Sequence, residues 1–101
     1  MEKRRPHYPL ERVKGLVLEG AYRVTDTARQ SAVNDFGLSK LDQIAACILD
    51  LDPVCFYKSM STHRDPRLWQ DVYRPEIQGV LAYVKIQIAD NDTVVISFKR
   101  L

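Results

Sequence analysis

The sequence has few of the residues that build metal centres and disulfide-bonded folds. It contains two cysteines and two histidines in 101 residues. Cys47 and Cys55 lie in apolar surroundings without a CxxC pair, and His7 and His63 are far apart. This pattern indicates buried free thiols in a reducing compartment and offers no zinc-ligand spacing. We therefore expect a cytoplasmic protein that uses no metal and no cofactor.

Long apolar stretches are also missing. No run approaches the roughly 20 residues that cross a bilayer, so we expect no membrane partner. The charged start, residues 1–6, has no apolar segment behind it, which argues against a secretory signal. Hydrophobic residues make up 46% of the chain and charged residues 28%. These values suit a single domain over residues 1–101.

The excess of positive charge is small, at +2, but it is unevenly distributed. Residues 1–23 carry six Lys or Arg against three Glu, and residues 54–101 carry seven basic against five acidic residues. Residues 24–53 carry two basic and five acidic residues. The two basic parts could face a polyanion, although most such charged faces contact only solvent. Binding to DNA depends largely on contacts between basic side chains and phosphates. Because the net charge is only +2, we do not expect this chain to bind DNA on its own.

The first half of the sequence predicts helices. Pro9 can occupy the first turn of a helix whose apolar residues follow at helical spacing as far as Gly20. A second, short helix is expected to begin after Thr25 or Asp26 and to end at Gly37.

The third predicted helix has the clearest pattern. Ser39 is its candidate N-cap, with Asp42 three residues later, and Asp52-Pro53 ends it because proline removes a donor. Apolar residues repeat at helical spacing along it: Leu41, Ile44, Ala45, Ile48 and Leu49.

The second half changes to a period of two. Four segments rich in β-branched and aromatic residues predict strands at 54–62, 68–74, 80–88 and 93–99. Two core faces are expected, one of Val80, Ala82, Val84, Ile86 and Ile88, the other of Val94, Ile96 and Phe98. The sequence therefore predicts an α+β fold with N-terminal helices packed on one face of a mainly antiparallel sheet.

The strand register can be predicted from the loops. A three-residue loop over residues 90–92 places Tyr83 opposite Lys99 and Lys85 opposite Ser97, with the apolar residues of both strands on one face.

The register of the preceding strands is set by a further assumption. If Gln70 shares the face of Tyr83, a four-residue loop over residues 75–78 places the two side chains opposite each other. A hairpin between the first two strands then places Met60 opposite Gln70 and Lys58 one diagonal step away. A bulge near the loop would shift this register.

The resulting set on one face, Lys58, Gln70, Tyr83 and Lys99, suits metal-free cleavage of RNA. The ribose 2′-OH attacks its own phosphate, and the protein must align the attack, move protons and stabilise charge on phosphorus. Lysines beside a tyrosine also favour its phenolate form. The alternative to catalysis is that these side chains are ordinary solvated residues of an exposed sheet face, which is the commoner case. Three further aromatics are expected to be packing residues: Tyr57, Trp69 and Tyr73.

Several motifs resemble the MqsR (motility quorum-sensing regulator) toxins, and the resemblance extends over essentially the whole chain. The matching segments are Phe56–Thr62, Trp69–Pro75, Tyr83–Ile86 and Val95–Lys99, together with the start at Met1–Arg4. Ser61 and His63 depart from the family pattern, which affects the expected sequence preference more than the expected activity.

The resemblance implies a RelE-like fold and an endoribonuclease that cleaves single-stranded mRNA without the ribosome, at GC-containing triplets. It implies catalytic roles for Lys58, Gln70, Tyr83 and Lys99. Three nearby side chains are added as candidate RNA contacts: Met60, Arg74 and Lys85.

The resemblance also implies a partner, an antitoxin with a zinc-binding N-terminal domain and a helix-turn-helix C-terminal domain. Contact with DNA would then be indirect, through the antitoxin. Two alternatives to the nuclease are a non-catalytic co-regulator that acts through antitoxin binding and a small RNA-binding module. The RNA-binding module is disfavoured because such modules expose paired aromatics on central strands, whereas Tyr83 is here a single aromatic among basic side chains.

Overall fold

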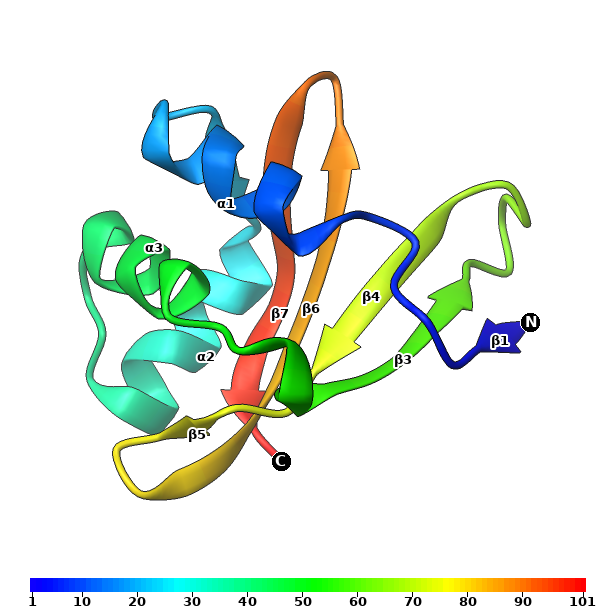
Figure 1. Cartoon of the computed structure of the whole chain (residues 1–101). Coiled ribbons are helices and arrows are strands. Elements are labelled where there is room, and N and C mark those ends of the chain that lie inside the picture. Colours follow the sequence, from blue (N-terminus) through cyan, green and yellow to red (C-terminus); the bar gives the residue numbers. More distant parts are fainter.

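The computed structural model describes residues 1–101 as three helices packed against a sheet (Figure 1). The helices are α1 (Leu10–Leu18), α2 (Asp26–Phe36) and α3 (Leu41–Leu49), followed by the 3-10 turn η1 (Pro53–Cys55). The strands are β1 (Glu2–Lys3), β2 (Tyr22–Val24), β3 (Phe56–Ser61), β4 (Trp69–Tyr73), β5 (Glu76–Ile77), β6 (Val80–Ala89) and β7 (Asp92–Arg100). The predicted α+β class is confirmed. None of the helices is long and apolar enough to cross a membrane.

The strands form one sheet in the order β1, β3, β4, β6, β7, β2, and β5 pairs with β6 beside this path. Every pair is antiparallel except β2 with β7. The three helices lie together on one side of the sheet (Figure 1). We call the other side the open face. It carries the residues of β6 that alternate with the core, among them Tyr83, Lys85 and Gln87.

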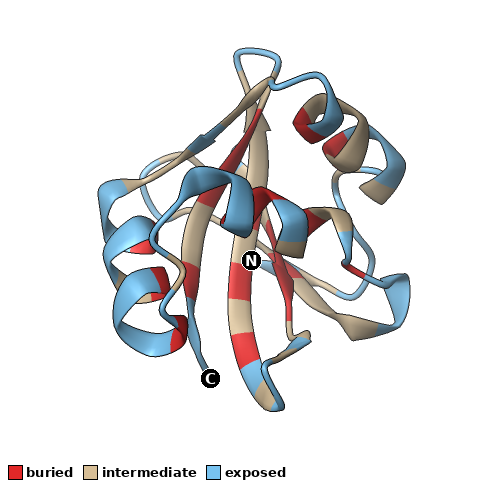
Figure 2. Cartoon of the chain, turned by 90° about the vertical axis from the view of Figure 1, so that its left-hand side faces the viewer, coloured by how far each residue is buried: buried red, intermediate tan, exposed pale blue.

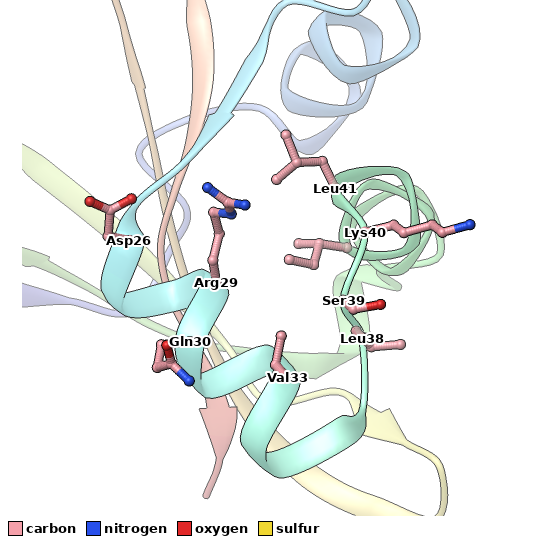
Figure 3. A pocket seen from close by; sticks show the side chains of 9 residues that line it. Asp26, Arg29, Gln30, Val33, Leu38, Ser39, Lys40 and Leu41 are labelled. Carbon is pink, nitrogen blue, oxygen red and sulfur yellow. The ribbon is translucent and has the colours of Figure 1, made fainter.

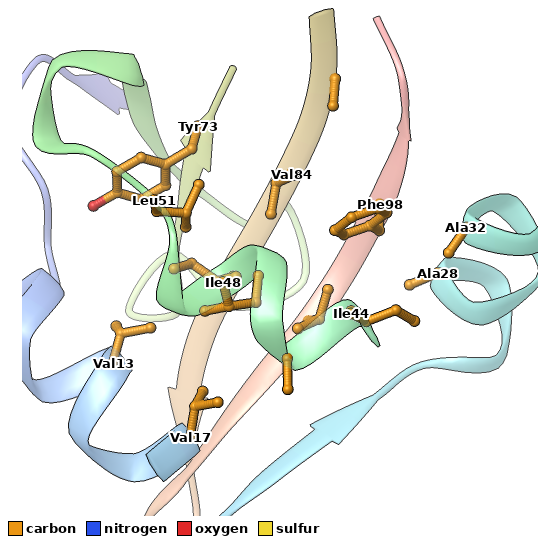
Figure 4. Close-up of a cluster of buried hydrophobic side chains, with 14 of the residues drawn as sticks. Val13, Val17, Ala28, Ala32, Ile44, Ile48, Leu51, Tyr73, Val84 and Phe98 are labelled. Atoms are coloured by element: carbon orange, nitrogen blue, oxygen red, sulfur yellow. The ribbon is translucent and has the colours of Figure 1, made fainter. Parts of the chain in front are cut away.

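The core lies between the helices and the two longest strands. Ala82, Val84 and Ile86 of β6 are at most 1% exposed, and they pack with Phe98 of β7 and with apolar residues of all three helices (Figure 4). In Figure 2 the buried residues recur along the strands and on the helix sides that face them. Each fully buried Val, Ile or Phe side chain contributes about 1.5–3 kcal/mol. The core face predicted for β6 is therefore confirmed.

The first two predicted helices are confirmed. α1 begins at Leu10, directly after Pro9, and ends two residues before Gly20. Thr25 caps α2, because its hydroxyl oxygen accepts the backbone N–H of Ala28 at 3.1 Å. Gly37 closes this helix in the left-handed conformation, at φ +69°, where a side chain would be strained.

The bounds predicted for the third helix were wrong by a residue or more at each end. Lys40, and not Ser39, is the N-cap residue, because the side chain of Gln43 accepts the Lys40 backbone N–H at 3.1 Å. The helix ends at Leu49, before Asp52-Pro53. That pair instead starts η1, where the Asp52 carboxylate accepts the Val54 backbone N–H at 2.8 Å.

The β6–β7 hairpin confirms the register predicted for the end of the two strands that lies away from their loop. Tyr83 lies opposite Lys99 and Lys85 lies opposite Ser97. The loop has two residues and not three, because Asp90 and Asn91 both take left-handed φ angles of 54° and 61°, as a tight hairpin turn requires.

A bulge in β7 reconciles the shorter loop with this register. The pairing shifts between Lys85 and Ile86, so that Ile86 lies opposite Val95. The predicted core face of β7 was therefore wrong in part, since Val95 joins the core while Val94 turns to the open face. Thr25 explains the position of the bulge, because its backbone N–H donates to Val95 and its hydroxyl to the carbonyl of Ile96.

The register predicted between β4 and β6 was wrong. Residues 75–78 do not form a plain four-residue loop. β5 pairs with the start of β6 through a tight turn at Gln78-Gly79, where both φ angles are positive. This added hairpin moves β6 by four residues relative to β4. Val72 lies opposite Lys85, and Gln70 consequently lies across from Gln87 and not from Tyr83.

The N-terminal segment is fixed to the sheet by Asp71. This fully buried carboxylate on β4 accepts the backbone N–H groups of His7 at 3.0 Å and Tyr8 at 2.9 Å. Tyr8 also donates its hydroxyl to the carbonyl of Trp69, whose ring stacks on His7. These contacts hold residues 1–9 across the β3–β4 hairpin and bring β1 to the sheet edge.

We expect Asp71→Ala to lower the free energy of unfolding by about 3 kcal/mol, because two bonds to a charged acceptor are lost and two backbone donors are left unpaired. Urea denaturation followed by circular dichroism measures the change. Asp35→Ala is the matched control, since Asp35 accepts one backbone N–H, from Arg100, at an exposed site. A loss of equal size in both variants would contradict the anchoring role of Asp71.

Candidate functional site

The four predicted site residues lie on one face of the sheet. Opposed residues of paired strands share a face, as do alternate residues along one strand. Lys58 lies opposite Val72, which lies opposite Lys85. The open face therefore collects Lys58, Gln70, Tyr83 and Lys99. Met60 lies opposite Gln70, as predicted.

Arg74, and not Gln70, lies beside Tyr83. The Ala82 backbone N–H donates to the carbonyl of Pro75 at 2.8 Å, which continues the β4–β6 register past the end of β4. Arg74 and Tyr83 consequently face each other across the two strands. The row on the open face is Arg74, Tyr83, Lys99, with the Lys99 ammonium 5.3 Å from the Tyr83 ring centre.

Lys85 occupies the centre of this group of cations. It lies two residues along β6 from Tyr83, and its cross-strand neighbours are Val72 and Ser97. Burial lowers the pKa of the half-buried Lys85 ammonium, and the positive charges of Lys99 and Lys58 lower it further. This lysine therefore holds its proton less firmly than an ordinary one.

Tyr57 joins the open face through a backbone irregularity that the sequence did not reveal. The β3–β4 pairing shifts between Phe56 and Lys58, and Tyr57 lies at the shift. The Arg74 guanidinium stacks 3.5 Å from the Tyr57 ring centre, and its buried Nε has no hydrogen-bond partner. Tyr57 is a packing residue, as expected, and the side chain that its ring packs against is Arg74 of the cationic group.

Gln70 belongs to a different part of the open face. Its side-chain amide donates to the side-chain oxygen of Gln87 at 3.0 Å. Gln87 is four residues from Tyr83 along β6, which corresponds to about 13 Å. The structure therefore brings Gln70 and Tyr83 to one face but not to one point. The alternation along β6 already indicated that Gln87 faces the same side as Tyr83.

Other candidate sites offer less chemistry. A hollow of about 320 Å³ lies between α2 and the start of α3, lined by the residues drawn in Figure 3. A second, of about 410 Å³, is lined in part by Cys47 and Cys55. Both thiols are free and half-buried, where we expected them buried, and burial raises the pKa of each. No group of three or more His, Cys, Asp or Glu is placed to hold a metal ion.

The open face is suited to an anionic, extended ligand. It presents four cations, Lys58, Arg74, Lys85 and Lys99, around the phenols of Tyr57 on β3 and Tyr83 on β6. Guanidinium and ammonium groups bind phosphate, and a phenol can exchange protons at a reacting oxygen. The fold and the site thus define a small α+β protein whose open sheet face gathers cationic and phenolic side chains.

Comparison with known proteins agrees with this class. The family model described as motility quorum-sensing regulator, toxin of MqsA, matches residues 5–100. The mRNA interferase toxin MqsR of Escherichia coli (strain K12) is 42% identical over 99 residues, which covers 98% of each chain. The chain therefore belongs to the MqsR toxin family, as the sequence motifs indicated.

We expect Lys85→Met to stabilise the fold at neutral pH by more than the roughly 0.5 kcal/mol that ordinary surface substitutions change. The lowered pKa means that the unfolded chain binds more protons than the folded one between the lowered value and the ordinary value of 10.5. Stability contributed by wild-type Lys85 therefore rises with pH through that window.

The advantage of Lys85→Met should accordingly shrink as the pH is raised toward 10. Thermal melts of both proteins over a pH series measure the difference. An advantage that does not change with pH would show that burial and the neighbouring lysines do not lower the pKa of Lys85.

Proposed function

We propose that this chain is the toxin of a toxin–antitoxin pair, an endoribonuclease that cleaves single-stranded mRNA without the ribosome and without a metal ion. One observation carries the proposal. Tyr83 lies between Arg74 and Lys99 on adjacent strands, and Lys85 is its next neighbour on the same face. Membership of a toxin family with an mRNA interferase relative supports the choice of RNA as the substrate.

The proposed reaction is a transesterification within RNA. The ribose 2′-oxygen bonds to phosphorus as the bond between phosphorus and the 5′-oxygen breaks. One proton leaves the 2′-OH and another reaches the departing 5′-oxygen, so the products carry a 2′,3′-cyclic phosphate and a 5′-OH. The protein has to align this attack, move two protons and stabilise the added negative charge.

The open-face residues fit these tasks. The scissile phosphate would lie over Tyr83, with its non-bridging oxygens facing Arg74, Lys85 and Lys99. Tyr83 would exchange a proton with a reacting oxygen. Because the charges are fixed before the substrate arrives, little reorganisation is needed as charge develops on phosphorus.

Gln70 has a recognition role in this proposal. It lies about 13 Å along the sheet from Tyr83, so it would contact a nucleotide beside the scissile one. Its amide, paired with Gln87, offers donors and acceptors to a base edge or a ribose. Met60, directly opposite Gln70, adds an apolar contact. The preference for GC-containing triplets that the family resemblance implies would be read here.

The partner in this proposal is an antitoxin of the kind named in the family description, toxin of MqsA. We expect it to have a zinc-binding N-terminal domain and a helix-turn-helix C-terminal domain, and to connect this chain to DNA.

The test compares three purified proteins on single-stranded RNA in EDTA: wild type, Tyr83→Phe and Tyr22→Phe. Wild type should cut and leave a cyclic phosphate end. Tyr83→Phe should lower kcat by about 10²- to 10⁴-fold with little change in KM, because a group that moves a proton is lost. Tyr22→Phe, on β2 and away from the open face, should retain full activity.

Two outcomes would contradict the proposal. Strict dependence of cleavage on added metal would reject the mechanism, and an unchanged rate for Tyr83→Phe would make this residue a packing residue. Growth arrest by Tyr83→Phe at wild-type strength in a bacterial host would favour the non-catalytic co-regulator.

A further inference from the structure

A carboxylate lies at the edge of the cationic open face. Glu2 of β1 pairs with Met60 of β3, so it lies on the same face as Met60 and Lys58. Its Oε2 atom accepts a hydrogen bond from the Lys58 ammonium and forms an ion pair with it. The Lys58 side chain is only 20% exposed, whereas the Glu2 side chain is 53% exposed.

The position of Glu2 is fixed by its backbone. β1 is bonded to β3 in register, and the Ser61 backbone N–H donates to the carbonyl of Met1 at 2.9 Å. Lys3, on the opposite side of β1, lies over the Trp69 ring at 4.2 Å. Asp71 holds the residues that follow. The carboxylate is thus presented to Lys58 by an anchored segment.

We propose that the Glu2 carboxylate pairs with Lys58 at the position that an RNA phosphate would take. Bound RNA must displace this carboxylate, so the affinity for RNA is lower than the cations alone would give. The inference rests on the proposed function, because it takes RNA to be the ligand of the open face. It adds to that function a residue that no motif on the strands indicated.

A role for Glu2 as the catalytic base fits the structure less well. The hydrogen bond from Lys58 and its positive charge lower the pKa of the Glu2 carboxyl, which makes the carboxylate a weak base. β1 is also separated from β6, which carries Tyr83, by β3 and β4. Its contact is with Lys58, and through Lys58 it influences the site.

The ion pair should be visible in the salt dependence of binding. A lysine that binds a phosphate of single-stranded nucleic acid changes the slope of log K against log salt by about −0.7. If Lys58 has to leave Glu2 to bind the phosphate, the freed Glu2 carboxylate takes up a salt cation. This uptake offsets the cation released from the RNA, so the slope does not change. Glu2→Gln should therefore bind RNA more tightly and with a steeper slope, by about 0.7.

The experiment uses the full-length wild type, Glu2→Gln and Glu19→Gln. The probe is a fluorescent single-stranded RNA with 2′-O-methyl riboses throughout, which cannot be cleaved, and Kd is measured over a series of KCl concentrations. Glu19→Gln is the control, because it makes the same change in net charge at an exposed position directly after α1, on the helical side.

Glu2→Gln should lower Kd by up to about five-fold at low salt, the range expected for one exposed ion pair, and should show the steeper slope. Glu19→Gln should match wild type in slope. Equal Kd and slope in the two variants would overturn the inference. A large fall in kcat for Glu2→Gln on cleavable RNA, with KM unchanged, would overturn it too, because Glu2 would then be the base.

Wild-type cleavage of unmodified RNA is measured in parallel. Wild type that binds the probe but does not cut RNA contradicts the proposed nuclease, and the comparison of slopes still decides the role of Glu2. Wild type that binds no RNA overturns both.

Discussion

The packing of alternate β6 residues against the helices determines the position of the candidate site. Ala82, Val84 and Ile86 are buried in the core, so the intervening side chains of the same strand must point to the open face. Tyr83 and Lys85 are therefore held on that face by apolar contacts on the other side of the sheet. The partners of these two residues then follow from strand pairing alone.

Strand pairing brings like charges together at a cost. Lys58 and Lys99 both repel Lys85, and the lowered pKa of Lys85 reflects its burial first and then this repulsion. Two contacts compensate in part: the Glu2 carboxylate pairs with the Lys58 ammonium, and the face of the Tyr57 ring packs against the Arg74 guanidinium. A surface selected only for stability would not gather these groups. Their proximity therefore supports the reading of the open face as a site for a polyanion.

Much of the fold could be predicted from local patterns in the sequence. Helix starts depend on residues a few positions apart, such as Thr25 with Ala28, and the period of two along residues 80–88 identified both faces of β6. These features are decided by neighbours in sequence, which a pattern can report. The pairing of Tyr83 with Lys99 was predicted correctly from a loop one residue too long, and it holds only because the bulge in β7 restores the register.

The errors arose where distant contacts decide the outcome. The β7 bulge depends on Thr25, about 70 residues earlier in the chain. The β4–β6 register depends on a small hairpin at Gln78-Gly79 that the sequence does not distinguish from a loop. β1 contains two residues, too few for any periodicity, and only its pairing with β3 brings Glu2 to Lys58. The site was thus predicted as a set of residues but not as an arrangement.

The most direct measurement is a crystal structure of this protein with a single-stranded RNA that carries one 2′-deoxyribose at the cleavage position. We expect the scissile phosphate beside the Tyr83 hydroxyl, with Arg74, Lys85 and Lys99 around its non-bridging oxygens, and the neighbouring nucleotide at Gln70 and Gln87. RNA bound on the helical side, or a scissile phosphate placed at Gln70 and away from Tyr83, would contradict this expectation.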